Sequence, residues 1–181
     1  MVITVLGRTD KRPVIYTLIK LFQKLGDTCF ITPDLRATRL IEDGGNYGHF
    51  QNTFIAVTNA SQDEVFADIG YTRNDFEHFI FDAYDQIPDF SDLVIYVGGA
   101  GVKTEEEETL LEMAGDFKTI NLGFGEKCIP YTADMFKAVE TIEGLKHLLP
   151  IHPQITSRLA TFLTEPLNIP VKHIIKVVSS K

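Results

Sequence analysis

Short apolar runs alternate with helical patterns along most of this chain, and this alternation constrains the fold more than any other feature. The first run, Val2–Leu6, precedes a segment, residues 14–25, whose apolar side chains recur at spacings of three and four. Further strand-like runs are 28–32, 52–58, 76–81, 92–97 and 117–122, with a short one at 127–130, and helical patterns cover 135–149 and 155–163. Strands that alternate with helices form parallel sheets flanked by helices. We therefore predict an α/β fold, a three-layer Rossmann-like arrangement with a mostly parallel sheet and helices on both faces.

Length and charge narrow the class of protein further. The 181 residues are enough to bury a substantial core, and no repeat or linker divides them, so residues 1–181 are expected to form one domain. A net charge of −8 argues against a nucleic-acid partner, because such partners require clustered Lys and Arg. Cys29 and Cys128 lie in apolar runs and are expected to be free buried thiols. With no secretory signal and no membrane-spanning run, we expect a cytoplasmic protein.

The turn between the first strand and the first helix carries the main functional signal. A phosphate-binding loop at such a turn has the pattern G-x-x-x-x-G-K-[ST], whose glycines expose N–H groups and whose lysine reaches the phosphates. Residues 8–13 are instead Arg-Thr-Asp-Lys-Arg-Pro. Lys11 and Arg12 supply positive charge, but Pro13 lacks an N–H group and Asp10 adds negative charge. The turn is therefore expected to start a helix and not to hold a phosphate.

In their order, the elements of residues 1–150 resemble the ParA/MinD-type branch of the P-loop ATPases. The resemblance rests on the opening strand and the helix ending in Lys24-Leu25-Gly26, on the strand 76–81 followed by Asp82, and on Pro88 with the run 91–97. It implies a P-loop NTPase-like fold. The loop glycines, phosphate-binding lysines and Mg²⁺-binding hydroxyl of that family have no counterparts here. The chain is therefore most similar to degenerate members of pilus-assembly and secretion loci.

The resemblance also assigns roles to two acidic residues that follow strands. Asp82 falls where the family places the carboxylate that orients Mg²⁺ through water, and Asp34 falls where it often places an acid that positions the attacking water. Because the carboxyl ends of parallel strands share one edge, Asp34, Asp82, Lys11 and Arg12 are expected to form a vestigial site. Without the loop, phosphoryl transfer loses its main source of charge stabilisation, so we expect no catalytic residue, no metal and no cofactor.

A glycine-rich segment, residues 42–52, follows the second strand. A mobile loop is the favoured interpretation, but the segment is also the best candidate for an exposed partner surface, at Gly45, Tyr47 and His49. A second glycine-rich turn, residues 98–101, precedes Thr104 and four glutamates. The glutamates suit a helix start and would repel a bound anion, which favours a tight turn.

The histidines and the last eleven residues offer weaker signals. The five histidines are dispersed, and His78, on a buried-type strand, is expected to be a core residue with its hydrogen bonds satisfied. Residues 171–181 place four apolar side chains at i, i+3, i+4 and i+7 with lysines opposite. MinD-type proteins carry a membrane-targeting helix at this end, whereas the β-branched residues suit a closing strand equally well. Packing against the domain is favoured over peripheral membrane contact, because so short a stretch binds membranes weakly.

Together these features predict a catalytically inactive ParA/MinD-like protein that acts as a scaffold or regulator through a protein partner or a homodimer. A bacterial pilus, secretion or conjugation system is the setting that the resemblance implies. Two alternatives remain open. One is a nucleotide-binding switch or ATPase with an unorthodox site at Asp34 and Asp82, and the other is a membrane-associated positioning factor that uses residues 171–181.

Overall fold

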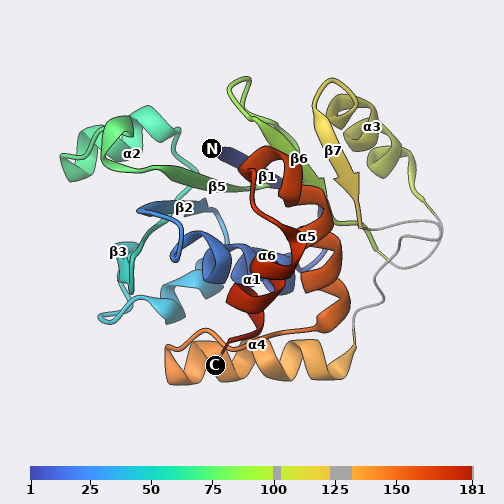
Figure 1. Ribbon diagram of the computed structural model, residues 1–181. Coiled ribbons are helices and arrows are strands. Elements are labelled where there is room, and N and C mark those ends of the chain that lie inside the picture. The colour runs from blue at the N-terminus through green and yellow to red at the C-terminus, as the bar shows by residue number, and fades with distance from the viewer. Residues whose placement is uncertain (100–102, 123–131, 181) are drawn as a thin grey trace.

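The computed structural model describes residues 1–99, 103–122 and 132–180, with side chains at all of these except positions 62 and 69 (Figure 1). Its centre is a seven-stranded sheet in the order β3-β4-β2-β5-β1-β6-β7. The strands are β1 (Val2–Leu6), β2 (Thr28–Thr32), β3 (Tyr47–Phe50), β4 (Thr53–Val57), β5 (His78–Ala83), β6 (Leu93–Tyr96) and β7 (Lys118–Asn121). Every pairing is parallel except that of β3 with β4. The predicted α/β class with a mostly parallel sheet is confirmed.

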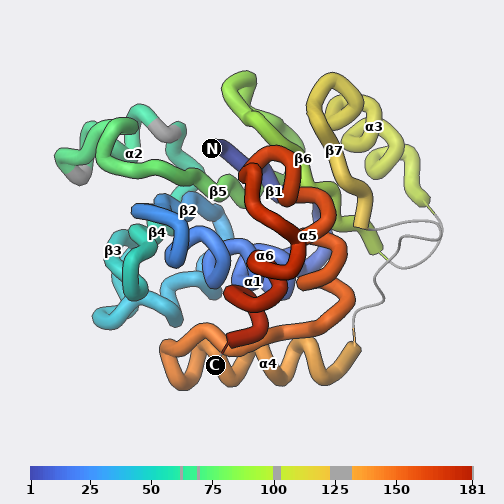
Figure 2. Tube along the Cα trace, in the orientation of Figure 1, coloured from blue at the N-terminus to red at the C-terminus, as the bar shows by residue number. Residues whose placement is uncertain are grey.

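Helices cover both faces of the sheet, as expected (Figures 1 and 2). The helices are α1 (Arg12–Phe22), α2 (Gln62–Ile69), α3 (Glu105–Ala114), α4 (Ala133–Leu145), α5 (Pro153–Leu167) and α6 (Val171–Ser179), with short 3-10 helices η1 (Leu35–Leu40) and η2 (Arg73–Asp75). Because successive strand residues point to opposite faces, Ile3 and Val5 of β1 join the core beneath α1, α4, α5 and α6, whereas Val2 and Leu6 join the cores under α2 and α3.

Helix α1 lies between the sheet and the C-terminal helices, so every residue of it except Arg12 is buried. It contacts α4, α5 and α6 on the side away from the sheet. The helix begins at Arg12 and ends at Phe22, earlier at both ends than the predicted 14–25. Gly26 was expected to end this helix, but the C-cap is Gln23. Gly26 instead leaves room for the Glu77 side chain, because a Cβ at position 26 would lie 1.8 Å from its Oε2 atom.

The segment predicted as a mobile glycine-rich loop contains an edge strand. Tyr47–Phe50 pairs antiparallel with β4, and Gln51, with φ of 55°, lies in the connection between the two strands. The loop prediction is therefore wrong for β3. The sequence pattern did not reveal this strand, because residues 47–50 do not alternate between apolar and polar side chains. They are held in a strand by their pairing with β4.

Most other predicted local features agree with the structure. Thr104 caps α3 in a capping box with Glu107, and Ser61 does the same for α2 with Glu64. Cys29 is a free buried thiol whose pKa is raised by burial to about 12. His78 differs from expectation, because it is half-buried and its Nδ1 atom has no hydrogen-bond partner. Cys128 and the short strand expected at 127–130 lie outside the described residues.

The C-terminal segment forms a helix, α6, and not the closing strand that its β-branched residues also allowed. Ile174 and Val178 of α6 are fully buried, and the helix packs on α5 and α1 (Figure 2). Lys20 of α1 donates hydrogen bonds to the carbonyl groups of Leu148 (3.0 Å) and Ser180. The apolar face of α6 therefore belongs to the core. Among the helices of the described ranges, none is long and apolar enough to cross a bilayer.

Candidate functional site

The turn after β1 passes so close to the end of β6 that only glycine fits at position 7. Gly7 has φ of +139°, and a Cβ there would lie 2.1 Å from the carbonyl oxygen of Val97. The Gly7 N–H donates to the carbonyl of Ala83 (3.1 Å), and the Thr9 hydroxyl donates to that of Val97 (3.0 Å). The turn is thus held against the ends of β5 and β6, at the edge where open parallel sheets build their sites.

Lys11 directs its side chain back beneath this turn. Its ammonium lies 2.9 Å from Oδ1 of Asp82 and donates to the carbonyl groups of Ala83 (2.9 Å) and Gly7. The Lys11 and Asp82 side chains are only 2% and 3% exposed. Burial lowers the pKa of Lys11, and the negative charge of Asp82 opposes that shift. The ammonium therefore donates two hydrogen bonds to carbonyl groups and forms an ion pair with Asp82, and its Nζ atom also lies 3.7 Å from the centre of the Tyr84 ring.

The second carboxylate oxygen of Asp82 connects β5 to the end of β2. The hydroxyl of Thr32 donates to Oδ2 of Asp82 (2.6 Å) and accepts from the backbone N–H of Asp34 (3.0 Å). Asp82 and Asp34 are thereby linked through one buried threonine. The two carboxylates that the resemblance singled out do lie at the same sheet edge.

Two Asp-x-Arg segments follow β1 and β2 and adopt the same local structure. In each, the aspartate accepts from the arginine backbone N–H, at 3.1 Å for Asp10 and Arg12 and at 3.0 Å for Asp34 and Arg36. Each guanidinium also bonds both oxygens of its aspartate. Burial raises the pKa values of Asp10 and Asp34, but the arginine hydrogen bonds outweigh burial and leave both below their ordinary value. Arg36 joins the two segments by an ion pair with Asp10 at 3.0 Å.

A buried carboxylate from α4 completes the cluster. Glu143, with a side chain only 3% exposed, accepts from Arg12 (2.7 Å), Arg39 (3.0 Å) and the Tyr16 hydroxyl (2.9 Å). Burial and the charge of Glu143 raise the pKa of Tyr16. Burial lowers the pKa of Arg12, but its bonds to Asp10 and Glu143 raise it further, so the guanidinium stays charged. Glu143 therefore ties helix α4 to the start of α1.

We call these groups the strand-edge network. Its members are the cations Lys11, Arg12, Arg36 and Arg39 and the carboxylates Asp10, Asp34, Asp82 and Glu143. Four positive charges are matched by four negative charges, each within ion-pair distance of a partner. Of the predicted site residues, the structure brings Lys11, Arg12, Asp34 and Asp82 into this network. Sequence reasoning missed Arg36, Arg39 and Glu143; the repeated Asp-x-Arg pattern signals Arg36, and no local pattern signals the other two.

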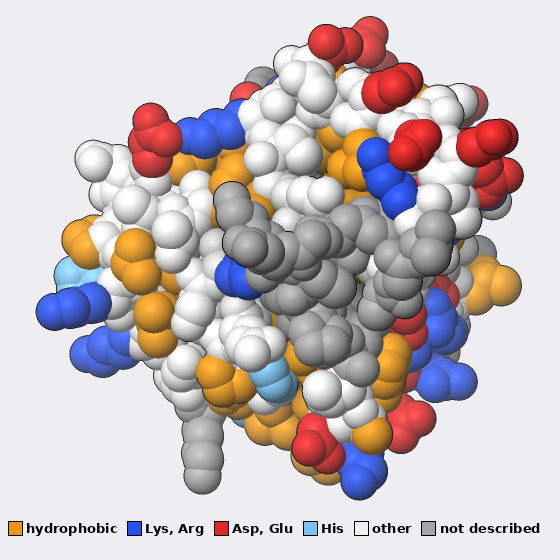
Figure 3. Space-filling view, turned by 90° about the vertical axis from the view of Figure 1, so that its right-hand side faces the viewer, with side chains coloured by type: hydrophobic (Ala, Val, Ile, Leu, Met, Phe, Trp, Pro, Cys, Tyr) orange, Lys and Arg blue, Asp and Glu red, His pale blue; other side chains and the backbone are white. Residues whose placement is uncertain are grey.

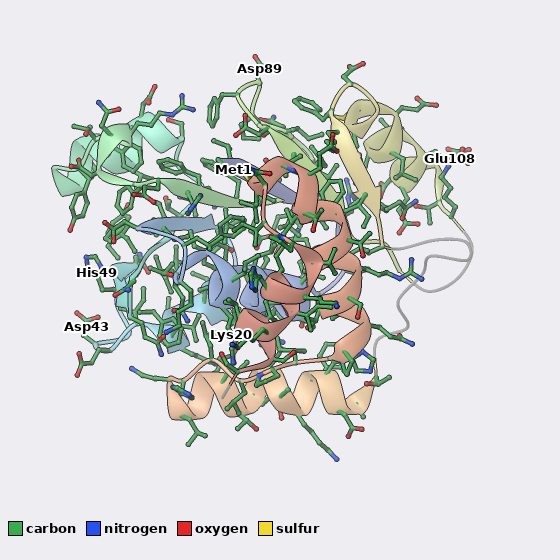
Figure 4. The ribbon with its side chains drawn as sticks, in the orientation of Figure 1. Met1, Lys20, Asp43, His49, Asp89 and Glu108 are labelled. Atoms are coloured by element: carbon green, nitrogen blue, oxygen red, sulfur yellow. The ribbon has the colours of Figure 1, made fainter. Side chains whose placement is uncertain are left out.

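The predicted partner surface lies elsewhere, at the β3 edge of the sheet. His49 and Asp43 lie together at that margin of the molecule (Figure 4). The His49 side chain is exposed and its Nε2 atom lies 3.2 Å from the Tyr71 hydroxyl, whereas Tyr47 is half-buried. Gly45 donates its N–H to Asp43 (3.0 Å). The hydrogen bonds of Gly45 and His49 therefore stay at this edge of the sheet, away from the strand-edge network.

Helix α3 gives its side of the molecule an acidic surface. Acidic side chains gather at the top of the face in Figure 3, on the side where α3 lies. Glu105, Glu106 and Glu108 are exposed in its first turn, and Glu107 accepts from the N–H of Gly99 (3.4 Å). Residues 100–102 of the preceding turn lie outside the described chain. Across the described ranges, no group of three or more His, Cys, Asp or Glu residues is arranged to hold a metal.

Comparison with known proteins yields a distant likeness to solved structures. No protein-family model and no curated protein matches the chain. Among solved structures, the MinD cell division protein of Aquifex aeolicus is similar at 13% identity, over 98% of this chain and 94% of that one, with a TM-score of 0.45. The likeness concerns the fold alone and assigns no activity to this chain.

Proposed function

We propose that this chain is a catalytically inactive, ParA/MinD-like protein that acts as a scaffold or regulator through contacts with other proteins. The strand-edge network is the observation that carries the proposal. A nucleotide site needs uncompensated donors and cations, because the transferring phosphoryl group is stabilised almost wholly by positioning and charge. In the network each cation already faces a carboxylate, so a phosphate would have to displace an existing ion pair.

The turn itself supports the same conclusion. Anion sites at helix starts depend on backbone N–H groups directed at the ligand. Here the carbonyl groups of Gly7 and Ala83 are directed at Lys11, and Pro13 contributes no N–H group. Both oxygens of Asp82 are engaged, one by Lys11 and the other by Thr32, which leaves this carboxylate poorly placed to orient a hydrated Mg²⁺.

Isothermal titration calorimetry with Mg·ATP and Mg·ADP tests the inactive assignment, together with a phosphate-release assay. We expect no binding at micromolar concentrations and no turnover. Micromolar binding with turnover that is lost in Asp82→Ala would overturn the proposal in favour of a nucleotide switch with an unorthodox site. The variant Glu140→Gln, at an exposed position of α4, is the matched control for any change in folding or purity.

The β3 edge is the surface we assign to the partner. β3 ends the described sheet and pairs only with β4, so one side of its backbone is open for strand addition. The Val57 N–H donates to the Asn46 carbonyl (2.7 Å), so Asn46 and Val57 form a hydrogen-bonded pair. Tyr47 and Ala56 form the next pair along the ladder. Because bonded and non-bonded pairs alternate in antiparallel ladders, Tyr47 and His49 direct their N–H groups away from β4.

Two substitutions at one position separate strand addition from side-chain contact. His49→Pro removes an outward N–H without breaking the β4 ladder, whereas His49→Ala keeps that donor and removes only the ring. If the partner is a second copy, light scattering should show a dimer that His49→Pro dissociates and His49→Ala preserves. A monomer at every concentration would exclude the homodimer and leave a different protein as the partner. A pilus, secretion or conjugation setting rests on the sequence resemblance.

A membrane role for residues 171–181 is the weaker alternative. The apolar side chains of Ile174 and Val178 that would enter a bilayer are already buried against the domain. Membrane insertion of α6 would therefore require the helix to leave the core.

A further inference from the structure

A cavity of about 680 Å³ lies beside the strand-edge network. It opens between the carboxyl ends of β2 and β5, the connection from β4 to α2, and the connection from β5 to β6. Ile31 and Phe81 contribute buried apolar surface, and Phe90 adds an aromatic wall. Asn59, Tyr84 and Asp85 are exposed lining residues that offer polar groups. Its volume is in the range of sites that enclose small organic molecules.

The charge of the lining restricts what such a molecule can be. The lining residues include two carboxylates and no lysine, arginine or histidine. Asp82 is already neutralised by Lys11 at 2.9 Å. Asp85 is exposed and takes part in none of the ion pairs of the described chain. An anionic ligand would therefore meet no cationic side chain among the lining residues, whereas a cationic ligand would meet the Asp85 carboxylate.

The aromatic residues add a preference for a ligand with an apolar body. Tyr84 and Phe90 are 36% and 41% exposed, unusual for large apolar rings in the described chain. Phe90 packs edge to face on Phe81, with ring centres 5.7 Å apart. Lys11 already lies over the Tyr84 ring at 3.7 Å and the Arg73 guanidinium over the Phe90 ring at 5.4 Å, so the rings offer a ligand apolar surface. Apolar surface of this kind favours a ligand with a hydrophobic body.

We propose that this cavity binds a low-molecular-weight organic amine, whose ammonium pairs with Asp85 and whose aromatic or aliphatic body packs on Phe81 and Phe90. The assignment goes beyond the scaffold role and is independent of it, because it uses no nucleotide and no part of the β3 edge. It predicts a protein that responds to a cationic small molecule and does not turn it over.

Three probes with one shared body test the charge preference. We would titrate phenethylamine, 2-phenylethanol and 3-phenylpropionate into the full chain and follow the Tyr84 and Phe90 resonances by NMR. The amine should bind about fivefold more tightly than the alcohol, the size expected of one partly exposed ion pair, and the carboxylate more weakly than either. Equal affinities for amine and alcohol, or no shift with any probe, would overturn the proposal.

Variants at exposed positions locate the site. Asp85→Asn should reduce the amine affinity to that of the alcohol, and Phe90→Ala should weaken both probes. Asp89→Asn is the matched control, since Asp89 lies at the tip of the same connection and outside the cavity lining (Figure 4). Amine binding unchanged by Asp85→Asn, or reduced equally by Asp89→Asn, would contradict the assignment. Calorimetry with Mg·ATP reports separately on the inactive assignment, so either proposal can fail alone.

Discussion

The Lys11 ammonium and the Asp82 carboxylate lie 2.9 Å apart at the carboxyl ends of β1 and β5, and both side chains are almost completely buried. A buried pair of this kind is retained only when its remaining hydrogen-bonding groups are satisfied. Here Lys11 also donates to the carbonyls of Gly7 and Ala83, and Oδ2 of Asp82 accepts from the Thr32 hydroxyl. The pair therefore closes the sheet edge at the turn between β1 and α1.

Removing the lysine should be strongly destabilising. Lys11→Met leaves the Asp82 charge buried without its partner, and we expect a loss of about 3–5 kcal/mol in the free energy of unfolding. Urea denaturation measures the change. The double variant Lys11→Met/Asp82→Asn should recover part of the loss, because no isolated charge remains. A Lys11→Met protein as stable as the unmodified chain would show that the pair contributes nothing.

The Glu143 carboxylate should matter far more than its exposed neighbour. Glu143→Gln removes the charge that Arg12 and Arg39 both contact, and we expect a cost of about 2 kcal/mol. Glu140→Gln on the same helix should change stability by less than about 0.5 kcal/mol, since that side chain is exposed. Similar effects for the two variants, measured by urea denaturation, would contradict a structural role for the network.

Two glycines with positive φ should respond differently to alanine. Gly7→Ala introduces both backbone strain and a Cβ that would lie 2.1 Å from the Val97 carbonyl oxygen. We expect a loss of more than about 3 kcal/mol, because the backbone of β6 must move. Gly44→Ala meets nothing within 4 Å and should cost only about 1 kcal/mol for its left-handed backbone. Thermal unfolding of the two variants compares the values, and equal losses would refute the close approach.

His78 should make the protein less stable as the pH falls. Burial, together with the positive N-terminus, lowers the pKa of His78 in the folded state to about 4. The unfolded chain, with a pKa of about 6.5, then binds more protons between these values. Stability should therefore decline from about pH 6.5 to about pH 4. Denaturation midpoints across this range should fall less steeply in His78→Gln, while the exposed His173→Gln should follow the unmodified chain.

The buried face of α6 should contribute to folding stability. Ile174→Ala opens a cavity against α1 and α5 and should cost about 2–5 kcal/mol. Lys172→Ala, on the exposed side of the same helix, should change the free energy of unfolding by less than about 0.5 kcal/mol. If Ile174→Ala proved neutral, α6 would be only loosely attached, and vesicle binding by residues 171–181 would become the better interpretation.

The sequence by itself determined the class of fold and the start of several helices. Periodicities of two and of three to four residues are set by backbone geometry, so the apolar runs located β1, β2, β5 and β6 without knowledge of their partners. Caps are equally local: Thr104 and Ser61 satisfy N–H groups within the next three residues. The position of Asp82 at the carboxyl end of β5 also followed from the pattern, because carboxyl ends of parallel strands meet at one edge.

Tertiary structure alone decided how the charges are paired and where β3 lies. Glu143 meets Arg12 across 131 positions of the chain, and that contact exists only because α4 packs against α1. β3 is a strand because β4 offers it a ladder, although its own residues show no alternating pattern. Ion pairs and antiparallel pairing depend on distances between elements, which a linear pattern does not contain. The sequence therefore located four residues of the strand-edge network, Lys11, Arg12, Asp34 and Asp82, and packing determined that the charges of the network compensate one another.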